Sequence, residues 1–191
     1  MANVDAAFGF KVVSTKNSNV KRFFMDGAIA QAVAVGDTMG VVGDNRQQSS
    51  TYQNRGYLVA DKLIAASDDY VGIAVAVYDS NMVEVGYLAA STIGFVDIET
   101  DPLAELLVQS TGSLTQVDVG DCSDVANTAP NETYKRSRQE IGAAADLAGN
   151  GSSEQFMILR KDETVDNAWG TNVNVIVIAN EHVYKGNSVA I

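Results

Sequence analysis

The sequence contains few of the residues that catalytic and metal sites most often use. Its 191 residues include one cysteine, Cys122, one histidine, His182, and two prolines. A single cysteine excludes an internal disulfide and a cysteine-based metal site. A catalytic triad would have to use His182, but no G-x-S-x-G motif supplies a nucleophile, and a zinc site with one histidine and one cysteine would need two carboxylates, which is a rare set. We therefore interpret both residues as structural and predict no catalytic residue, no metal and no cofactor.

Basic residues are scarce in the middle of the chain. No lysine or arginine occurs between Lys62 and Lys135, and residues 32–132 carry fifteen acidic and three basic residues in a chain of net charge −11. Nucleic-acid binding depends on neutralising phosphates, so we expect no nucleic-acid partner. No apolar run approaches the roughly 18 residues that a membrane span needs, and the first ten residues lack the features of a signal peptide. We expect a soluble protein made without secretion, with no membrane contact.

The residues that are abundant favour strands. Valine, isoleucine and threonine dominate the apolar segments, and turn-forming residues separate them. This pattern predicts an all-β fold with short strands, long loops and little helix, either a β-barrel or a β-sandwich of the β-tulip or jelly-roll kind. We expect either an N-terminal arm plus β subdomain over 1–92 and a C-terminal β subdomain over 93–191, or one continuous domain. The predicted strands lie at 33–35, 39–42, 57–59, 71–78, 83–88, 93–98, 156–159 and 173–178.

Three glycines, Gly36, Gly40 and Gly43, lie close together in the stretch AVAVGDTMGVVG. A phosphate-binding P-loop would need a lysine and a hydroxyl residue after the last glycine, whereas Asp44 follows Gly43 here. Asp37 would also add negative charge beside any phosphate. We therefore interpret the glycines as the punctuation of a β-hairpin, in which glycine permits a positive φ angle.

Two basic clusters are candidates for contact with a partner. The first 25 residues combine four basic residues with four phenylalanines, among them Phe8, Phe10 and Lys11. They are either an arm that orders on a partner or an ordinary first strand with core aromatics. The second cluster, Lys135, Arg136 and Arg138, is either a solvated loop or a docking point on an acidic partner.

The order of several short motifs resembles a family of tailed-bacteriophage structural proteins, the capsid decoration or cement proteins. The resemblance spans nearly the whole chain, and the similar segments are Met1 to Ala6 with Phe8-Gly9-Phe10, Val35-Gly36-Asp37-Thr38-Met39, Val71-Gly72-Ile73, Asp101-Pro102 with Leu107-Val108-Gln109, Leu114-Thr115 with Asp118-Val119-Gly120, Ser137 to Ile141, Asp166-Asn167 with Gly170, and Val175-Ile176-Val177 with Asn180-Glu181-His182.

The resemblance implies a non-enzymatic, all-β homotrimer that binds the major capsid protein. It would be made in the host cytoplasm and would then stabilise the exterior of an icosahedral head by clamping neighbouring capsid subunits. Another virion component, such as a tail or head–tail connector protein, is the alternative. A carboxylate-dependent hydrolase and a carbohydrate-binding protein are the other hypotheses. Abundant carboxylates permit the first, and few exposed aromatics argue against the second.

Overall fold

The computed structural model describes residues 3–27, 31–41, 57–63, 70–126, 129–149 and 152–184. Strands and bridges account for 47% of these residues and helix for 4%. The helical part consists of two single 3-10 turns, η2 (Gln116–Asp118) and η3 (Ala144–Asp146). The prediction of an all-β fold with little helix is therefore confirmed.

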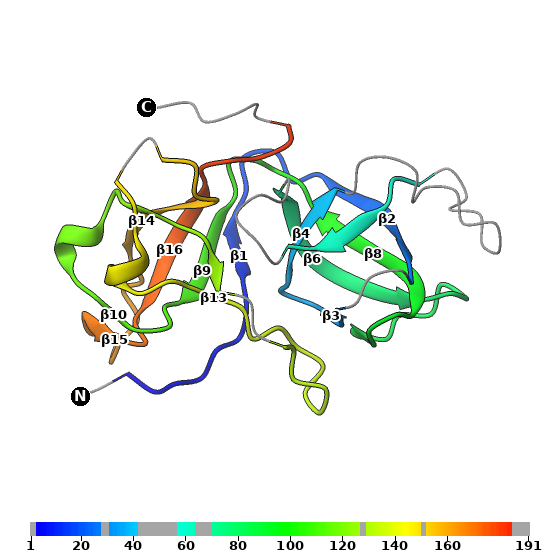
Figure 1. Ribbon diagram of the computed structural model, residues 1–191, viewed down its shortest axis with the longest axis horizontal. Coiled ribbons are helices and arrows are strands. Elements are labelled where there is room, and N and C mark those ends of the chain that lie inside the picture. Colours follow the sequence, from blue (N-terminus) through cyan, green and yellow to red (C-terminus); the bar gives the residue numbers. More distant parts are fainter. Residues whose placement is uncertain are drawn as a thin grey trace.

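Two five-stranded antiparallel sheets form two lobes, which lie side by side in Figure 1. Neither sheet closes into a barrel within the described residues, so the architecture is sandwich-like. The sheet of the first lobe has the order β2 (Val20–Asp26), β8 (Ile93–Glu99), β6 (Tyr70–Asp79), β4 (Thr38–Val41) and β5 (Ala60–Lys62). The sheet of the second lobe has the order β1 (Lys11–Ser14), β9 (Glu105–Gln109), β16 (Asn174–Ala179), β14 (Phe156–Lys161) and β11 (Cys122–Ser123).

Three two-stranded ladders accompany the two sheets. In the first lobe β3 (Val33–Ala34) pairs with β7 (Tyr87–Leu88). In the second lobe β10 (Ser113–Leu114) pairs with β15 (Gly170–Thr171), and β12 (Val125–Ala126) pairs with β13 (Glu140–Ile141).

The division of the chain between the lobes does not follow sequence order. β8 pairs with β2 and β6, so the first lobe extends to Glu99, beyond the expected boundary at residues 92/93. β1 pairs with β9, which places this early strand in the second lobe. The first lobe is therefore an insertion between the first two strands of the second lobe.

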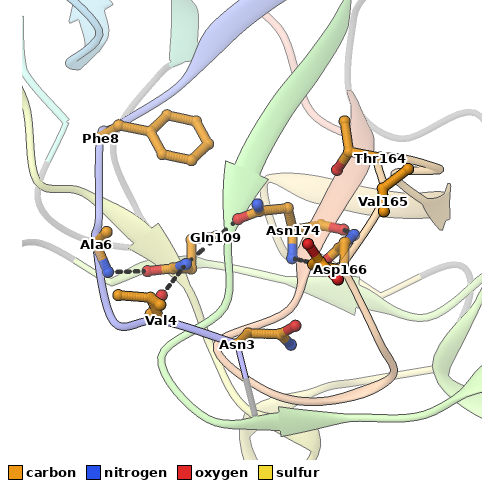
Figure 2. Close-up of a pocket in the computed structure, with 10 residues that line it drawn as sticks. Asn3, Val4, Ala6, Phe8, Gln109, Thr164, Val165, Asp166 and Asn174 are labelled. Carbon is orange, nitrogen blue, oxygen red and sulfur yellow. Dashed lines mark hydrogen bonds between the residues drawn. The ribbon is translucent and has the colours of Figure 1, made fainter. Parts of the chain in front are cut away.

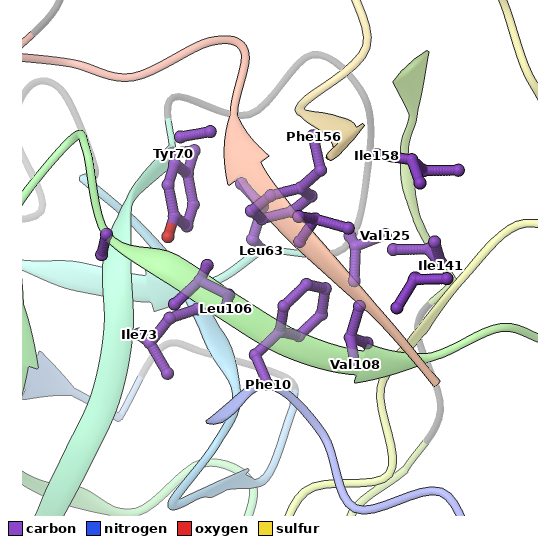
Figure 3. Close-up of a cluster of buried hydrophobic side chains, with 14 of the residues drawn as sticks. Phe10, Leu63, Tyr70, Ile73, Leu106, Val108, Val125, Ile141, Phe156 and Ile158 are labelled. Carbon is purple, nitrogen blue, oxygen red and sulfur yellow. The ribbon is translucent and has the colours of Figure 1, made fainter. Parts of the chain in front are cut away.

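The largest hydrophobic core connects the two lobes. Most of its residues come from the second lobe, but Leu63, Tyr70 and Ile73 come from the first (Figure 3). Phe156 contacts the rings of both Phe10 and Tyr70, with centroid distances of 4.8 and 5.0 Å. A separate core, formed around Phe23, Met39 and Val77, fills the first lobe. Since apolar burial is continuous across the junction, it holds the lobes together.

The glycine-rich stretch forms a turn between β3 and β4, as predicted, but the predicted β-hairpin is wrong, because β3 pairs with β7 and β4 pairs with β5 and β6. Gly36 has a φ angle of +90°, and the carbonyl oxygen of Phe10 lies where a side chain would project. Only glycine fits here without strain. Gly40 lies within β4, and Gly43 lies outside the described residues.

Asp37, next in the same turn, forms a fully buried ion pair with Lys62 of β5. The Asp37 Oδ2 and Lys62 Nζ atoms are 3.2 Å apart, and neither side chain has any exposed surface. Asp37 Oδ2 also accepts a hydrogen bond from the Ala34 N–H, at 2.9 Å. Burial raises the pKa of Asp37, and Lys62 opposes the rise; burial lowers the pKa of Lys62. Each charge is tolerated here because the other is present.

We predict that Asp37→Ala will reduce the free energy of unfolding by about 3–5 kcal/mol, because it leaves the Lys62 ammonium buried without its counter-charge. Adding Lys62→Met removes that charge and should restore most of the loss. Urea denaturation measures both, with the exposed Glu163→Ala as a control expected within about 0.5 kcal/mol of wild type. A loss of less than about 1 kcal/mol for Asp37→Ala would show that the pair is not a structural requirement.

Candidate interaction surface

The N-terminal segment, residues 3–10, is fastened to the second lobe by side-chain amides. Asn3 donates to the carbonyl oxygens of Ala168 and Thr171, at 2.8 and 2.9 Å, and accepts from the Ala168 N–H at 3.1 Å. Gln109 of β9 accepts from the Ala6 N–H at 3.0 Å and donates to the Val4 carbonyl oxygen at 3.1 Å (Figure 2). This segment is therefore ordered on its own protein.

A hollow of about 260 Å³ lies beside this segment (Figure 2). Amides line it, which is a common feature of sugar sites, but these amides are engaged. Gln109 Nε2 also donates to Asn172 O and Asn174 Oδ1, and Asn167 exchanges hydrogen bonds with the Asn174 backbone. The side-chain amide donors of Gln109 and Asn167 are thus satisfied within the protein.

The loop of residues 131–136 projects from the junction between the lobes (Figure 1). Asn131 and Arg136 pair through their backbones, and Asn131 Oδ1 accepts the Tyr134 N–H at 3.0 Å. Lys135 adopts a left-handed backbone with φ of 51°, which lysine rarely does. The Tyr87 hydroxyl of β7 donates to Glu132 Oε1 at 3.0 Å, which ties the loop to the first lobe.

The residues after this loop alternate between buried and exposed. Ser137 and Gln139 are fully buried, whereas Arg136 and Arg138 are exposed. The Ser137 N–H donates to the Val35 carbonyl oxygen at 3.0 Å. Alternation of this kind is that of an extended chain, so one segment attaches the second lobe to the first while presenting its cations to solvent.

Gln139 uses its whole amide to bridge the lobes. Its Oε1 accepts from the Thr38 N–H and hydroxyl, at 2.6 and 3.0 Å, and its Nε2 donates to the Leu63 carbonyl oxygen at 2.9 Å. The N-terminal segment also contacts the first lobe at this junction, where the Phe10 N–H donates to the Gly36 carbonyl oxygen at 2.8 Å. Gly9, with φ of +76°, packs so closely on Ser137 that a side chain would collide with it.

An open groove of about 570 Å³ lies where these segments meet, and it brings the two predicted basic clusters together. Of the six candidate contact residues, four line it with accessible surface: Phe8, Lys11, Lys135 and Arg136. Val35 and Leu107 add apolar surface. Segments more than 120 residues apart therefore form one surface, which the sequence could not show.

Phe10 is buried, whereas a residue that contacts a partner is expected to be exposed. Only 2% of its surface is exposed, and its ring packs on Phe156 in the core. Phe23 and Phe24 are also buried. The alternative of core aromatics is correct for these three phenylalanines. Phe10 and Phe8 both line the groove, but only Phe8, which is half-buried, has appreciable accessible surface there.

Arg138, the sixth candidate, lies on a neighbouring hollow of about 330 Å³ together with Asp5 and Tyr134. Burial raises the pKa of Glu140, and the nearby Asp5 adds to the rise while Arg138 opposes it. Arg138 therefore lies near the carboxyl group of Glu140, although it forms no ion pair with it. The three cations of the groove, Lys11, Lys135 and Arg136, have no carboxylate of the described residues within 4.0 Å.

Sequence reasoning missed Tyr134, which is 68% exposed and lies 5.6 Å from the Arg136 guanidinium, measured to the ring centroid. Its position next to a basic cluster was an available signal. Val35 and Leu107 gave no such signal in the sequence, because each has the pattern of an ordinary strand residue.

Cys122 is buried in β11, and His182, also buried, accepts the Tyr184 N–H at Nδ1 at 3.0 Å. In the described residues no three metal-ligating side chains gather.

The comparisons with known proteins give no relative for this chain: no protein-family model matches it, and no curated protein matches its sequence. Within the described residues, no helix is long and apolar enough to cross a membrane. By its fold and its groove, the chain belongs to the class of all-β proteins, with a basic, partly apolar surface at the junction of two lobes.

We predict opposite consequences for the two N-terminal phenylalanines. Phe10→Ala should reduce the free energy of unfolding by about 3–5 kcal/mol, because it leaves a cavity beside Phe156. Phe8→Ala should cost only about 1 kcal/mol, because the side chain is half-exposed. Denaturant unfolding of both variants tests this, and equal losses would contradict the assignment of Phe8 to the surface.

Proposed function

We propose that this chain is a capsid decoration protein that binds the outer surface of a tailed-phage head and stabilises it by clamping neighbouring major capsid protein subunits. The observation that carries the proposal is the groove, where exposed candidate residues from the N-terminal segment and from the 131–136 loop meet. The order of the sequence motifs supports it independently, as does the all-β fold. A clamp of this kind uses surface contact and needs no catalytic group.

The energetics of the groove fit a clamp. Burying one phenylalanine or leucine side chain contributes roughly 1.5–3 kcal/mol, whereas a rim charge pair contributes about 0–1 kcal/mol. Contacts to Phe8 and Leu107 would therefore supply most of the affinity, while Lys11, Lys135 and Arg136 would orient the protein and speed its encounter. The acidic remainder of the chain would face solvent.

Another virion structural role, in the tail or at the head–tail connector, is the alternative. The same groove would serve it, because the geometry specifies the chemistry of the contact and not its position on the particle. Electron microscopy of virions carrying a labelled copy of the protein separates the two roles.

We predict that the purified protein will bind phage heads that lack it, and that Phe8→Ala will weaken this binding by about 10-fold, as expected for an apolar anchor. Co-sedimentation with heads measures the affinity. Leu103→Ala is the matched control, since Leu103 is 43% exposed and lies outside the groove. Raising the salt concentration should weaken binding several-fold, because salt screens the exposed charges of the rim, and should leave the apolar contact to Phe8 in place.

Failure of the folded wild-type protein to bind such heads would overturn the proposed function. If the protein binds but Phe8→Ala and Leu103→Ala behave alike, the function stands and the contact lies elsewhere. Deletion of residues 3–8 would then show whether the N-terminal segment takes any part.

We further propose that the protein acts as a homotrimer on the head. The sheet of the second lobe ends in β1, which pairs on one side only in the described ladders. Symmetric assembly is a common way to cover sheet edges. Light scattering should give three times the chain mass of 20.2 kDa. A monomer in solution, together with single isolated copies on decorated heads, would refute the trimer.

A further inference from the structure

The groove combines an apolar floor with a basic rim. Phe8, Val35 and Leu107 are each half-buried, so part of every side chain remains accessible at its floor. Lys11, Lys135 and Arg136 are exposed around it. The volume, about 570 Å³, falls in the range of roughly 300–1,000 Å³ typical of sites that hold a compact ligand group.

The cations of the rim form no ion pair with a described carboxylate, in a chain that is acidic overall. No described carboxylate lies within ion-pair distance of the three cations, although acidic residues outnumber basic ones by 24 to 13. A local positive site of this kind complements a negative partner group. The net charge of −11 would repel a long polyanion such as nucleic acid, whereas a short acidic segment meets mainly the local field.

The rim is also held in place before any partner arrives. The turn at Asn131 fixes the left-handed backbone of Lys135, and Ser137, next to Arg136, is anchored on Val35 of the first lobe. Lys11 begins β1, which pairs with β9. Because these backbones are already ordered, a bound partner loses little affinity to ordering them.

We propose that the groove binds an extended segment of the partner that carries acidic side chains flanking an apolar one. The apolar side chain lies against Phe8 and Leu107, and the carboxylates meet the cations of the rim. This inference rests on the proposed function, in which the partner is the major capsid protein, and it specifies the chemistry of the capsid segment that is recognised.

Three fluorescent peptides of equal length test the chemistry directly with the full protein. One alternates glutamate and leucine, the second replaces glutamate by lysine, and the third replaces leucine by serine. We expect the first to bind at least about 10-fold more tightly than the other two in fluorescence anisotropy, because it alone satisfies both floor and rim.

Two substitutions with the same chemistry locate the binding. Lys135→Asn removes a rim charge and suits the left-handed backbone, so it should fold; we expect it to weaken binding of the glutamate–leucine peptide about 3- to 5-fold. Lys16→Asn removes the same charge from an exposed position outside the groove and should leave binding unchanged. Arg136→Glu reverses a rim charge and should weaken binding about 10-fold.

Equal binding of the three peptides, or equal effects of Lys135→Asn and Lys16→Asn, would overturn the inference. Tighter binding of a single-stranded oligonucleotide would assign the groove to nucleic acid instead, and loss of self-association in Lys135→Asn would assign it to a second copy. Head binding distinguishes the two levels of the proposal. If wild type and Arg136→Glu bind heads equally well, the groove is not the contact surface, but the proposed function stands. If the protein binds the peptide but not heads, the proposed function is refuted, and the groove still binds acidic segments.

Discussion

The arrangement of the two lobes depends on one buried polar junction, formed by the turn at Gly36 and Asp37. Lys62 neutralises Asp37 there, and Gln139 bonds to the next residue along, Thr38, and to the Leu63 carbonyl oxygen. Apolar contacts between the lobes supply attraction but little direction, whereas these hydrogen bonds have defined geometry and are costly to leave unmade in the interior. The junction therefore fixes how one lobe is oriented on the other.

The groove takes its geometry from this junction. The extended segment that buries Ser137 and Gln139 between the lobes also presents Arg136 to solvent. Gly9 packs on Ser137, and its neighbour Phe8 lines the same groove as Arg136. The distance between the apolar floor and the cationic rim is thus set by contacts made in the interior. A surface whose backbone is fixed in this way, by buried contacts and by the turn of the 131–136 loop, favours recognition of one partner geometry.

Much of the fold could be predicted from local pattern, and the surface could not. β6, β8 and β16 are apolar runs that read as strands by themselves, and the Gly36 turn follows from its glycine and aspartate. β1 is short and largely exposed, so only its pairing with β9, far along the chain, makes it a strand. The same applies to the basic clusters: each could be located in the sequence, but their meeting is a tertiary contact. An aromatic in a basic segment also gives no sign of whether it is buried, as Phe8 and Phe10 show.

The insertion of the first lobe between β1 and β9 has a consequence for synthesis on the ribosome. About 90 residues separate Ser14 from Glu105, so at about 5–20 residues per second β1 waits on the order of ten seconds for its partner strand. The sheet of the first lobe is complete only at Glu99, six residues before β9 begins, so the first lobe gains its last strand shortly before β1 gains its partner. β1 has Lys11 and Ser14 at its ends but Val12 and Val13 between them, and Val13 is 50% exposed. Until β9 is made, β1 is therefore an unpaired edge with exposed apolar surface, on which another nascent chain can pair.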